Sequence, residues 1–439
     1  MSPLSTGSVD AMNAQFHILS LIPSFRRGNH EKSVGYLSYS ARSPSDSRVT
    51  IDDLSTLLTS GRMSDANKLI IESAYTSTLD SEGQDVALRV AQQLIAATPE
   101  FHSTNPSNFN GEARYSKPLP VPSSEPYKAI VFVFLFGGLD SFYMLAPHKD
   151  CALYTDYAYM RGGMKLPTNS MLDIDATQSD AEQPCENLGV HSELKAMKTI
   201  YDSGHGIFLA NTGHMSKPVS KYNYLLETKT QLFSHHSMER ETYYVDAFRN
   251  KPGTGVLGRM LDVMQGMNHS VGPIGINTNS PILEGDPVMT RPQDVIGSRG
   301  AETIYPRSVS NSNSKEQMQG LITDLNSQTA IDSGFYGDHW SQTLVDSIVK
   351  TDLIKNTANN AVLSQSFSGT LGDQLKMVSK LIKTQFGRGV NRDAFVLRIS
   401  GFDHHANMVS GLNRLFKDIN KGIDTFYKEL QHQGESFFL

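Results

Sequence analysis

The most hydrophobic stretch of the chain runs from Ile130 to Phe136 and is apolar at every position. Gly137 and Gly138 end it. Strands that are buried on both faces of a parallel sheet have this continuous pattern, whereas half-exposed strands alternate between apolar and polar residues. We therefore predict a central parallel strand over residues 130–136, with helices on both faces of its sheet.

Later segments alternate between helical and strand patterns. Apolar residues at helical spacing predict one helix over 192–201 and another over 371–382. The apolar run at 207–210 predicts a strand after the first helix, and the run at 394–399 predicts a strand that ends at Gly401. Such alternation is typical of parallel α/β domains. The predicted fold is a three-layer α/β/α domain with a mostly parallel sheet, plus a small N-terminal helical segment.

The chain divides into three parts by composition. Residues 1–101 contain a stretch without clear periodicity and then two helical patterns. Several prolines among serines and asparagines mark residues 102–127 as a linker. Residues 128–439 form the main domain, and the polar sequence at about 280–345 predicts a loop-rich insertion within it.

Composition and charge exclude several classes of function. Of the 439 residues, 38% are hydrophobic and 19% are charged, which is typical of a globular protein. The net charge is −6 and there is no long Lys/Arg run, so we expect no nucleic-acid binding. The longest apolar run is too short to span a membrane. Residues 1–30 lack a basic start followed by an apolar core, so we expect no signal peptide.

The chain has two cysteines, Cys151 and Cys185. They form neither a metal knuckle nor the framework of a disulfide-rich protein. One bridge between them and two free thiols both fit the sequence. The usual behaviour of cysteine in proteins favours two free, partly buried thiols.

Residues with metal-binding chemistry follow the two best strand candidates. Asp140 and Ser141 come after the first strand, and Asp403 and His405 come after the strand that ends at Gly401. In an open parallel sheet, ligands collect beyond the carboxyl ends of the strands. Carboxylate and imidazole together suit zinc or manganese. The sequence therefore predicts a divalent metal site at this edge of the sheet.

A third polar cluster lies between these two, where Ser234 precedes His235 and His236. Each cluster also has an ordinary structural explanation. Asp140 fits a turn residue or a helix cap, the Asp403/His405 pair fits a surface turn, and the histidines fit a loop. The shared position of acids and histidines after strands favours a functional site.

Six blocks of the sequence carry a family resemblance. They are Phe134–Pro147 (FLFGGLDSFYMLAP), Asn187–Leu194 (NLGVHSEL), Phe208–Pro218 (FLANTGHMSKP), Gln231–His235 (QLFSH), Gly253–Arg259 (GTGVLGR) and Gly401–Met408 (GFDHHANM). Their order and spacing resemble those of the domain of unknown function 1501 family, in the alkaline phosphatase and sulfatase superfamily. Residues 87–101 resemble the C-terminal helix of a second family, domain of unknown function 1800.

The resemblance implies specific roles. Asp140 matches the first metal ligand, Ser234 the nucleophile, and Asp403 and His405 the late metal ligands. His235 and Ser141 are candidate supporting residues. Relatives in this family continue with another strand and two further polar motifs, so we expect the domain to be C-terminally incomplete. Relatives are commonly exported, which suggests a periplasmic setting.

The predicted function is metal-dependent hydrolysis of a small anionic phosphate or sulfate ester, with zinc or manganese as cofactor. A two-metal site needs about six protein ligands, more than the three that match here. The second hypothesis is therefore a non-catalytic protein that binds a carbohydrate or a partner through the same cleft.

Overall fold

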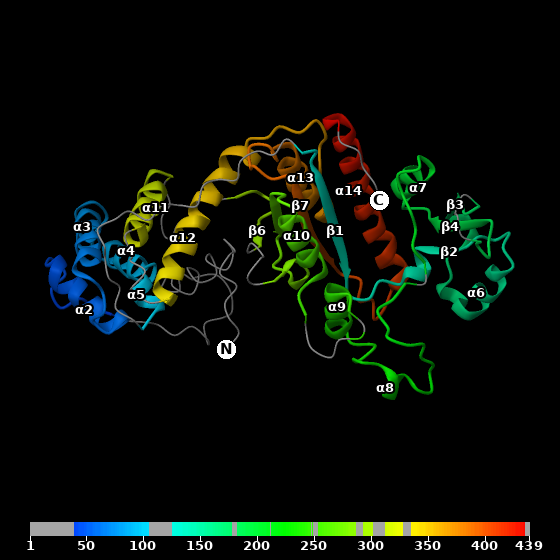
Figure 1. Ribbon diagram of the computed structural model, residues 1–439, viewed down its shortest axis with the longest axis horizontal. Helices are drawn as coiled ribbons and strands as arrows, with labels where there is room; N and C mark the ends of the chain where they lie inside the picture. Colours follow the sequence, from blue (N-terminus) through cyan, green and yellow to red (C-terminus); the bar gives the residue numbers. More distant parts are fainter. Residues whose placement is uncertain are drawn as a thin grey trace. The chain divides into compact units, whose positions relative to one another are not determined.

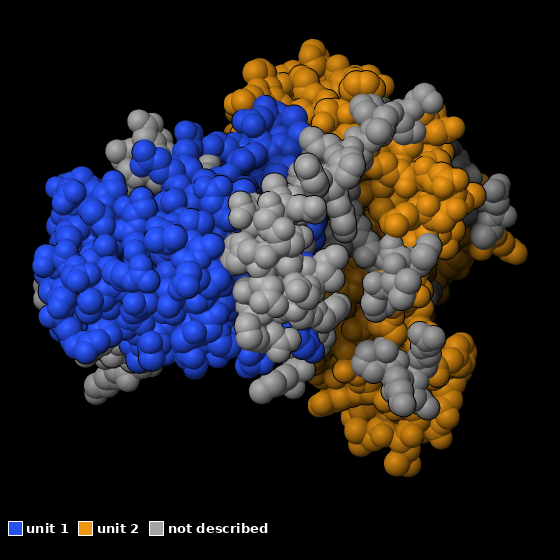
Figure 2. Space-filling model, turned by 60° about the vertical axis from the view of Figure 1, so that its left-hand side comes forward, with its two compact units in different colours: residues 1–120, 301–357 blue, residues 121–300, 358–439 orange. Residues whose placement is uncertain are grey.

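The computed structural model describes residues 39–104, 125–177, 182–210, 212–246, 248, 253–286, 293–301, 312–327 and 335–434. Contacts divide the chain into two compact units, coloured separately in Figure 2. We call residues 1–120 with 301–357 the helical unit, and residues 121–300 with 358–439 the sheet unit. Most of the predicted linker, at 105–124, lies outside the described residues.

The helical unit is built from amphipathic helices around one core. Its helices are α2 (Ser47–Thr59), α3 (Asp65–Glu82), α4 (Gln84–Ala96), α5 (Pro99–His102), α11 (Ser312–Ser327) and α12 (Phe335–Ile354). Side chains cap two of them, because Asp46 accepts a hydrogen bond from the Val49 N–H and Ser64 accepts one from the Asn67 N–H. The core includes Ile51, Leu54, Ile71, Tyr75, Leu94, Ile95, Ile322, Leu325 and Leu344.

The structure corrects the predicted loop-rich insertion at about 280–345. Much of that segment is helical, and α11 and α12 contribute buried residues to the same core as the N-terminal helices. Met318, Ile322 and Leu325 have the helical spacing that forms this contact. The polar residues around them obscured this pattern in the sequence.

The sheet unit is an α/β domain, as predicted (Figure 1). Its main described sheet contains β1 (Lys128–Phe136), β7 (Arg392–Ser400), β5 (Val271–Ile276) and β6 (Asp294–Ile296) in that spatial order. All neighbouring pairs are parallel. Phe136 pairs with Ser400, so β1 and β7 end side by side.

Two sequence predictions about strands were wrong. Among the described strands, β1 lies at the edge of the sheet rather than at its centre, and Ile130 is 42% exposed. A continuous apolar run indicates contact on both faces but does not reveal whether both edges have hydrogen-bonded neighbours. The predicted strand at 207–210 is irregular, and most of its side chains are exposed.

Helices cover both faces of the main sheet (Figure 1). On one face, α9 (His235–Tyr244) and α10 (Val256–Gly266) share a core with alternate residues of the strands, among them Phe132, Phe134, Ala394 and Val396. The other set of β7 side chains, which includes Phe395 and Leu397, points to the opposite face. There α13 (Thr370–Lys383) contacts β7 and β5, and α14 (Met408–Gln433) packs against α13.

A small antiparallel sheet completes the sheet unit. Its order is β2 (Leu145–Pro147), β4 (Asn187–His191), β3 (Met171–Asp175), and the helices α6 (Leu153–Arg161) and α7 (Lys195–Asp202) contact it. The short helix α8 (Tyr224–Glu227) follows them in the chain. A disulfide joins Cys151 to Cys185, which overturns the preference for free thiols. The cysteines flank the paired strands β2 and β4, and this pairing holds their Cα atoms 5.3 Å apart.

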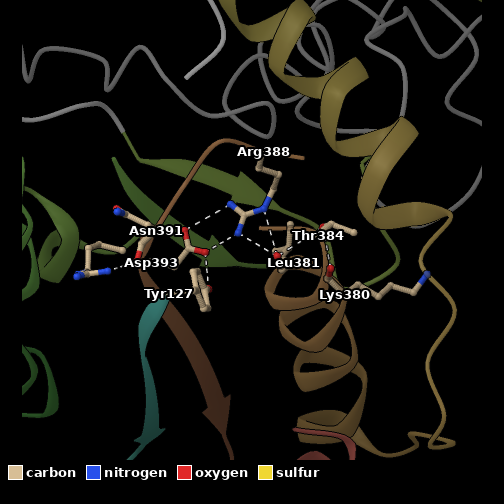
Figure 3. Close-up of polar contacts among 8 residues, drawn as sticks. Tyr127, Lys380, Leu381, Thr384, Arg388, Asn391 and Asp393 are labelled. Atoms are coloured by element: carbon tan, nitrogen blue, oxygen red, sulfur yellow. Dashed lines mark hydrogen bonds and ion pairs between the residues drawn. The ribbon is translucent and has the colours of Figure 1, made fainter. Parts of the chain in front are cut away.

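A buried ion pair secures the start of β7 (Figure 3). The Arg388 guanidinium binds both carboxylate oxygens of Asp393 and also donates a 3.0 Å hydrogen bond to the Leu381 carbonyl. The Tyr127 hydroxyl donates a 2.6 Å hydrogen bond to the same carboxylate. These contacts tie α13, β7 and the entry to β1 together, at the opposite end of the strands from the candidate site.

No helix in the described part of the chain has an apolar stretch long enough to cross a membrane.

Candidate active site at the ends of β1 and β7

Two glycines after β1 allow three chain segments to meet. Gly137 has φ +114°, and a Cβ atom there would lie 2.7 Å from the backbone nitrogen of Asp403. Gly138 has φ +79°, and its Cβ would lie 3.3 Å from the His235 ring. Both φ values favour glycine, and side chains would separate the segments. The Gly-Gly turn therefore brings the end of β7 and the start of α9 against the end of β1.

Asp403 contacts two imidazoles. Its Oδ1 atom lies 3.4 Å from Nε2 of His235 and 3.0 Å from Nε2 of His405. Asp403 and His235 are about half exposed, and His405 is largely exposed. The structure thus brings together Asp403 and His405, both predicted metal ligands, and His235, a predicted supporting residue. Solvent can reach all three side chains.

Ser234 is the N-cap of α9. Its Oγ atom accepts a hydrogen bond of 3.4 Å from the Ser237 N–H. The first turn of a ten-residue helix therefore lies directly behind the hydroxyl. Free N–H groups and the helix dipole at such a position favour negative charge. A developing negative charge on Oγ, or an anion beside it, would be stabilised there.

Asp140 pairs with a residue outside this group. Its carboxylate forms an ion pair with Arg161 at the end of α6. Asp140 is the N-cap residue of the short helix η1 (Ser141–Tyr143), but its side chain makes no capping hydrogen bond there. Ser141 is exposed on the same helix. The contact that the structure shows for this carboxylate is thus a guanidinium rather than the Asp403 cluster.

The side chains of this cluster are of types that bind metals, but they are not arranged around a common metal position. Asp403, His235 and His405 supply one carboxylate and two imidazoles, which are normal zinc ligands. Both imidazoles contact the same oxygen atom, as in a hydrogen-bonded cluster. Across the described residues, no group of three or more His, Cys, Asp or Glu side chains is arranged to hold an ion.

An open pocket of about 380 Å³ lies beside the cluster. Its wall combines the end of β1 with one face of α9 and the residues just before it. The lining residues are Phe134, Leu135, Phe136, Gly137, Gly138, Leu232, Phe233, Ser234, His235, Met238, Glu239 and Thr242. Ser234 and His235 therefore face the same space.

Charged residues at the pocket wall pair with each other. The Arg398 guanidinium lies 3.7 Å from the centre of the Phe136 ring and 3.5 Å from the Glu239 carboxylate. The Tyr243 hydroxyl donates a 2.6 Å hydrogen bond to Glu239. Burial and then this carboxylate raise the pKa of Tyr243, so its hydroxyl stays protonated as a donor.

Sequence reasoning missed several of these residues. Arg398 interrupts an apolar strand run, and a charge at such a position is a signal that it has a specific partner. Glu239 and Tyr243 are spaced by four residues, as expected for neighbours on a helix. Nothing local in the sequence connects Arg161 with Asp140.

Comparisons of this chain with protein-family models, curated proteins and solved structures find no match.

Proposed function

We propose that the sheet unit carries a hydrolase-like site for phosphate or sulfate esters, with Ser234 as the nucleophile and Asp403 and His405 as ligands for a zinc- or manganese-class ion. The observation that supports this proposal most directly is the convergence of Asp403, His405 and His235 at the strand ends, next to Ser234. They come from two segments that are far apart in the sequence, and these segments meet where ligands bind in parallel sheets.

The chain's own residues have distinct roles in this proposal. The Ser234 Oγ atom attacks the phosphorus or sulfur atom, and the ester oxygen leaves. His235 accepts the hydroxyl proton, because it lines the same pocket, and Asp403 orients its ring. The first turn of α9 stabilises negative charge near Oγ. A bound divalent ion would act as a Lewis acid toward the ester oxygens.

Asp140 has a conditional role. It matches a metal ligand in the resemblance, but its carboxylate is paired with Arg161. Ligation by Asp140 therefore requires this ion pair to open. The guanidinium therefore competes with the ion for this carboxylate, whose side chain is 15% exposed.

One observation favours a second, non-catalytic function. Phe233 is 77% exposed beside the pocket, and exposed aromatic rings serve as stacking surfaces for ligands. The alternative is a protein that binds a carbohydrate or a partner through this cleft without turnover. In that case Asp403 and the histidines are polar contacts of the binding site.

Hydrolysis assays with added zinc or manganese distinguish these functions. Nitrophenyl phosphate and nitrophenyl sulfate are suitable substrates, and zinc binding is measured in parallel by calorimetry. We expect Ser234→Ala to lower metal-dependent hydrolysis by at least about 100-fold and to leave zinc binding intact. Asp403→Asn should weaken zinc binding. Ser203→Ala changes an exposed serine of the same unit and serves as the control.

The outcomes separate clearly. Hydrolysis that is unaffected by Ser234→Ala contradicts the proposed nucleophile. Zinc binding without any hydrolysis favours the non-catalytic function, and absence of both rejects the metallohydrolase proposal for this chain.

A further inference from the structure

We propose that the pocket beside Ser234 binds an uncharged aromatic group, which is the non-reacting part of the ester substrate. The role of this group as part of a substrate rests on the proposed function, whereas its binding to the pocket does not. We call the site the aromatic groove and define it by Phe134, Phe136, Leu232, Phe233 and Met238, with Glu239 and Thr242 at its side.

The groove is lined by rings and other apolar side chains on two regular elements. Phe134 and Phe136 lie two residues apart on β1 and point to the same face, with ring centres 6.3 Å apart. Met238 and Thr242 follow Ser234 at steps of four residues, so they share one face of α9. Both elements hold their side chains at defined positions, which favours a shaped binding site over a mobile surface.

An exposed aromatic ring, that of Phe233, lines the groove. Phe233 is 77% exposed, and its ring meets the Tyr224 ring edge-on at 5.5 Å. Stacking on such a ring would remove apolar surface from water on both partners. An aromatic group therefore gains more binding free energy here than a polar group of the same size.

The charges around the groove select against an anionic occupant. Neither lysine nor arginine is among the described residues that line it. The carboxylate in the lining, Glu239, already contacts Arg398 and Tyr243. Arg398 in turn lies over the Phe136 ring. A second negative charge in the groove would lie beside the Glu239 carboxylate, and Arg398 already pairs with that carboxylate, so the buried part of the ligand is uncharged.

The size of the groove limits its occupant to a small group. Its volume of about 380 Å³ falls near the lower end of ordinary ligand pockets. One or two fused rings fit this space, whereas a helix of about 10 Å diameter does not. The anionic end of such a ligand would reach Ser234 and His235, which line the same pocket.

Binding of the neutral fluorescent dye N-phenylnaphthylamine to the full chain, without added metal, tests the groove. We expect saturable binding that Phe233→Ser weakens by about tenfold or more. Thr242→Phe should weaken it similarly by filling the groove, with no apolar residue removed. Phe386→Ser is the matched control, because Phe386 is 65% exposed and lies outside the groove. Circular dichroism confirms that each variant is folded.

Two results would overturn the groove as a binding site: no saturable binding, or equal effects of the Phe386 and Phe233 changes.

The substrate role needs a separate comparison, in which naphthyl phosphate and butyl phosphate are hydrolysed by the parent chain and by Phe233→Ser. A preference for the aryl ester that disappears in Phe233→Ser supports the role, and equal rates for both esters refute it. If no ester is hydrolysed, the proposed function fails, and dye binding still decides whether the groove binds aromatic groups.

Discussion

The Nε2 atom of His235 lies 3.4 Å from the Oδ1 atom of Asp403, although one residue begins α9 and the other follows β7. Their contact depends on Gly137 and Gly138, which leave room for both segments at the end of β1. The geometry of the candidate site is therefore set by backbone packing as much as by its polar side chains.

A methyl group at Gly137 should separate these segments. The alanine side chain would lie 2.7 Å from the Asp403 backbone nitrogen, and φ is +114°. We expect Gly137→Ala to lower the free energy of unfolding by about 2–3 kcal/mol, as measured by urea denaturation, and to weaken any metal or ligand binding at the site.

Gly204→Ala is the control for Gly137→Ala. Gly204 has φ +73°, and among the described residues no neighbouring atom lies within 4 Å of the place that an alanine Cβ would take, so only the backbone strain of about 1–2 kcal/mol applies. Equal effects of the two substitutions would show that the contact between Gly137 and Asp403 is not tight.

The ion pair between Arg161 and Asp140 gives a second prediction. If Asp140 becomes a metal ligand when the pair opens, Arg161→Gln should raise zinc affinity by about tenfold, since one opposing interaction of roughly 1.4 kcal/mol disappears. Calorimetric titration measures this change. The control is Lys198→Gln, which breaks an exposed pair with Asp202 in the same unit. Unchanged or weaker zinc binding in Arg161→Gln would assign Asp140 a structural role.

The buried ion pair at the start of β7 predicts a large loss of stability. Arg388→Met leaves the Asp393 carboxylate buried with the Tyr127 hydroxyl but without its cation. Removing one partner of a buried pair typically costs about 3–5 kcal/mol. Lys428→Met breaks the exposed pair with Asp424 and should cost less than about 1 kcal/mol. Urea denaturation of both variants checks this difference, and a small loss for Arg388→Met would contradict it.

Sequence patterns predicted the parts of the fold that depend on local chemistry. The apolar runs that became β1 and β7 are recognisable because a parallel strand packs on both faces. The position of polar residues after a strand led to Asp403 and His405, since strand ends align in a parallel sheet. Ser234 was predicted only from the family resemblance.

Features that depend on long-range pairing were not recognisable. The edge position of β1 depends on which other strands pair with it, and the sequence around Ile130 does not reveal this. The disulfide depends on the pairing of β2 with β4, strands too short to produce a clear pattern. Arg161 meets Asp140 because of where α6 lies, and no spacing rule connects them.

The stability of the helical unit should depend on pH through His102. The His102 ring stacks on Trp340 at 3.5 Å between ring centres, and its Nε2 atom lies 2.8 Å from the Ala96 carbonyl oxygen. Burial lowers the pKa of His102 from 6.5 to about 4, and the hydrogen bond to Ala96 only partly opposes this. The folded chain therefore keeps a neutral imidazole at pH values where the unfolded chain is protonated.

This difference fixes the sign of the pH dependence. As the pH falls from about 6.5 to about 4, the unfolded state takes up a proton that the folded state does not. The free energy of unfolding should fall over this range by up to about 3 kcal/mol. Trp340, which is the one tryptophan of the chain, allows urea denaturation of this unit to be followed by fluorescence. His102→Phe keeps the ring stack on Trp340 and should make the free energy of unfolding nearly independent of pH over this range. The control is His432→Phe, at an exposed position of α14, which should keep the pH dependence of the parent chain. If His102→Phe keeps the same pH dependence, another group is responsible for it.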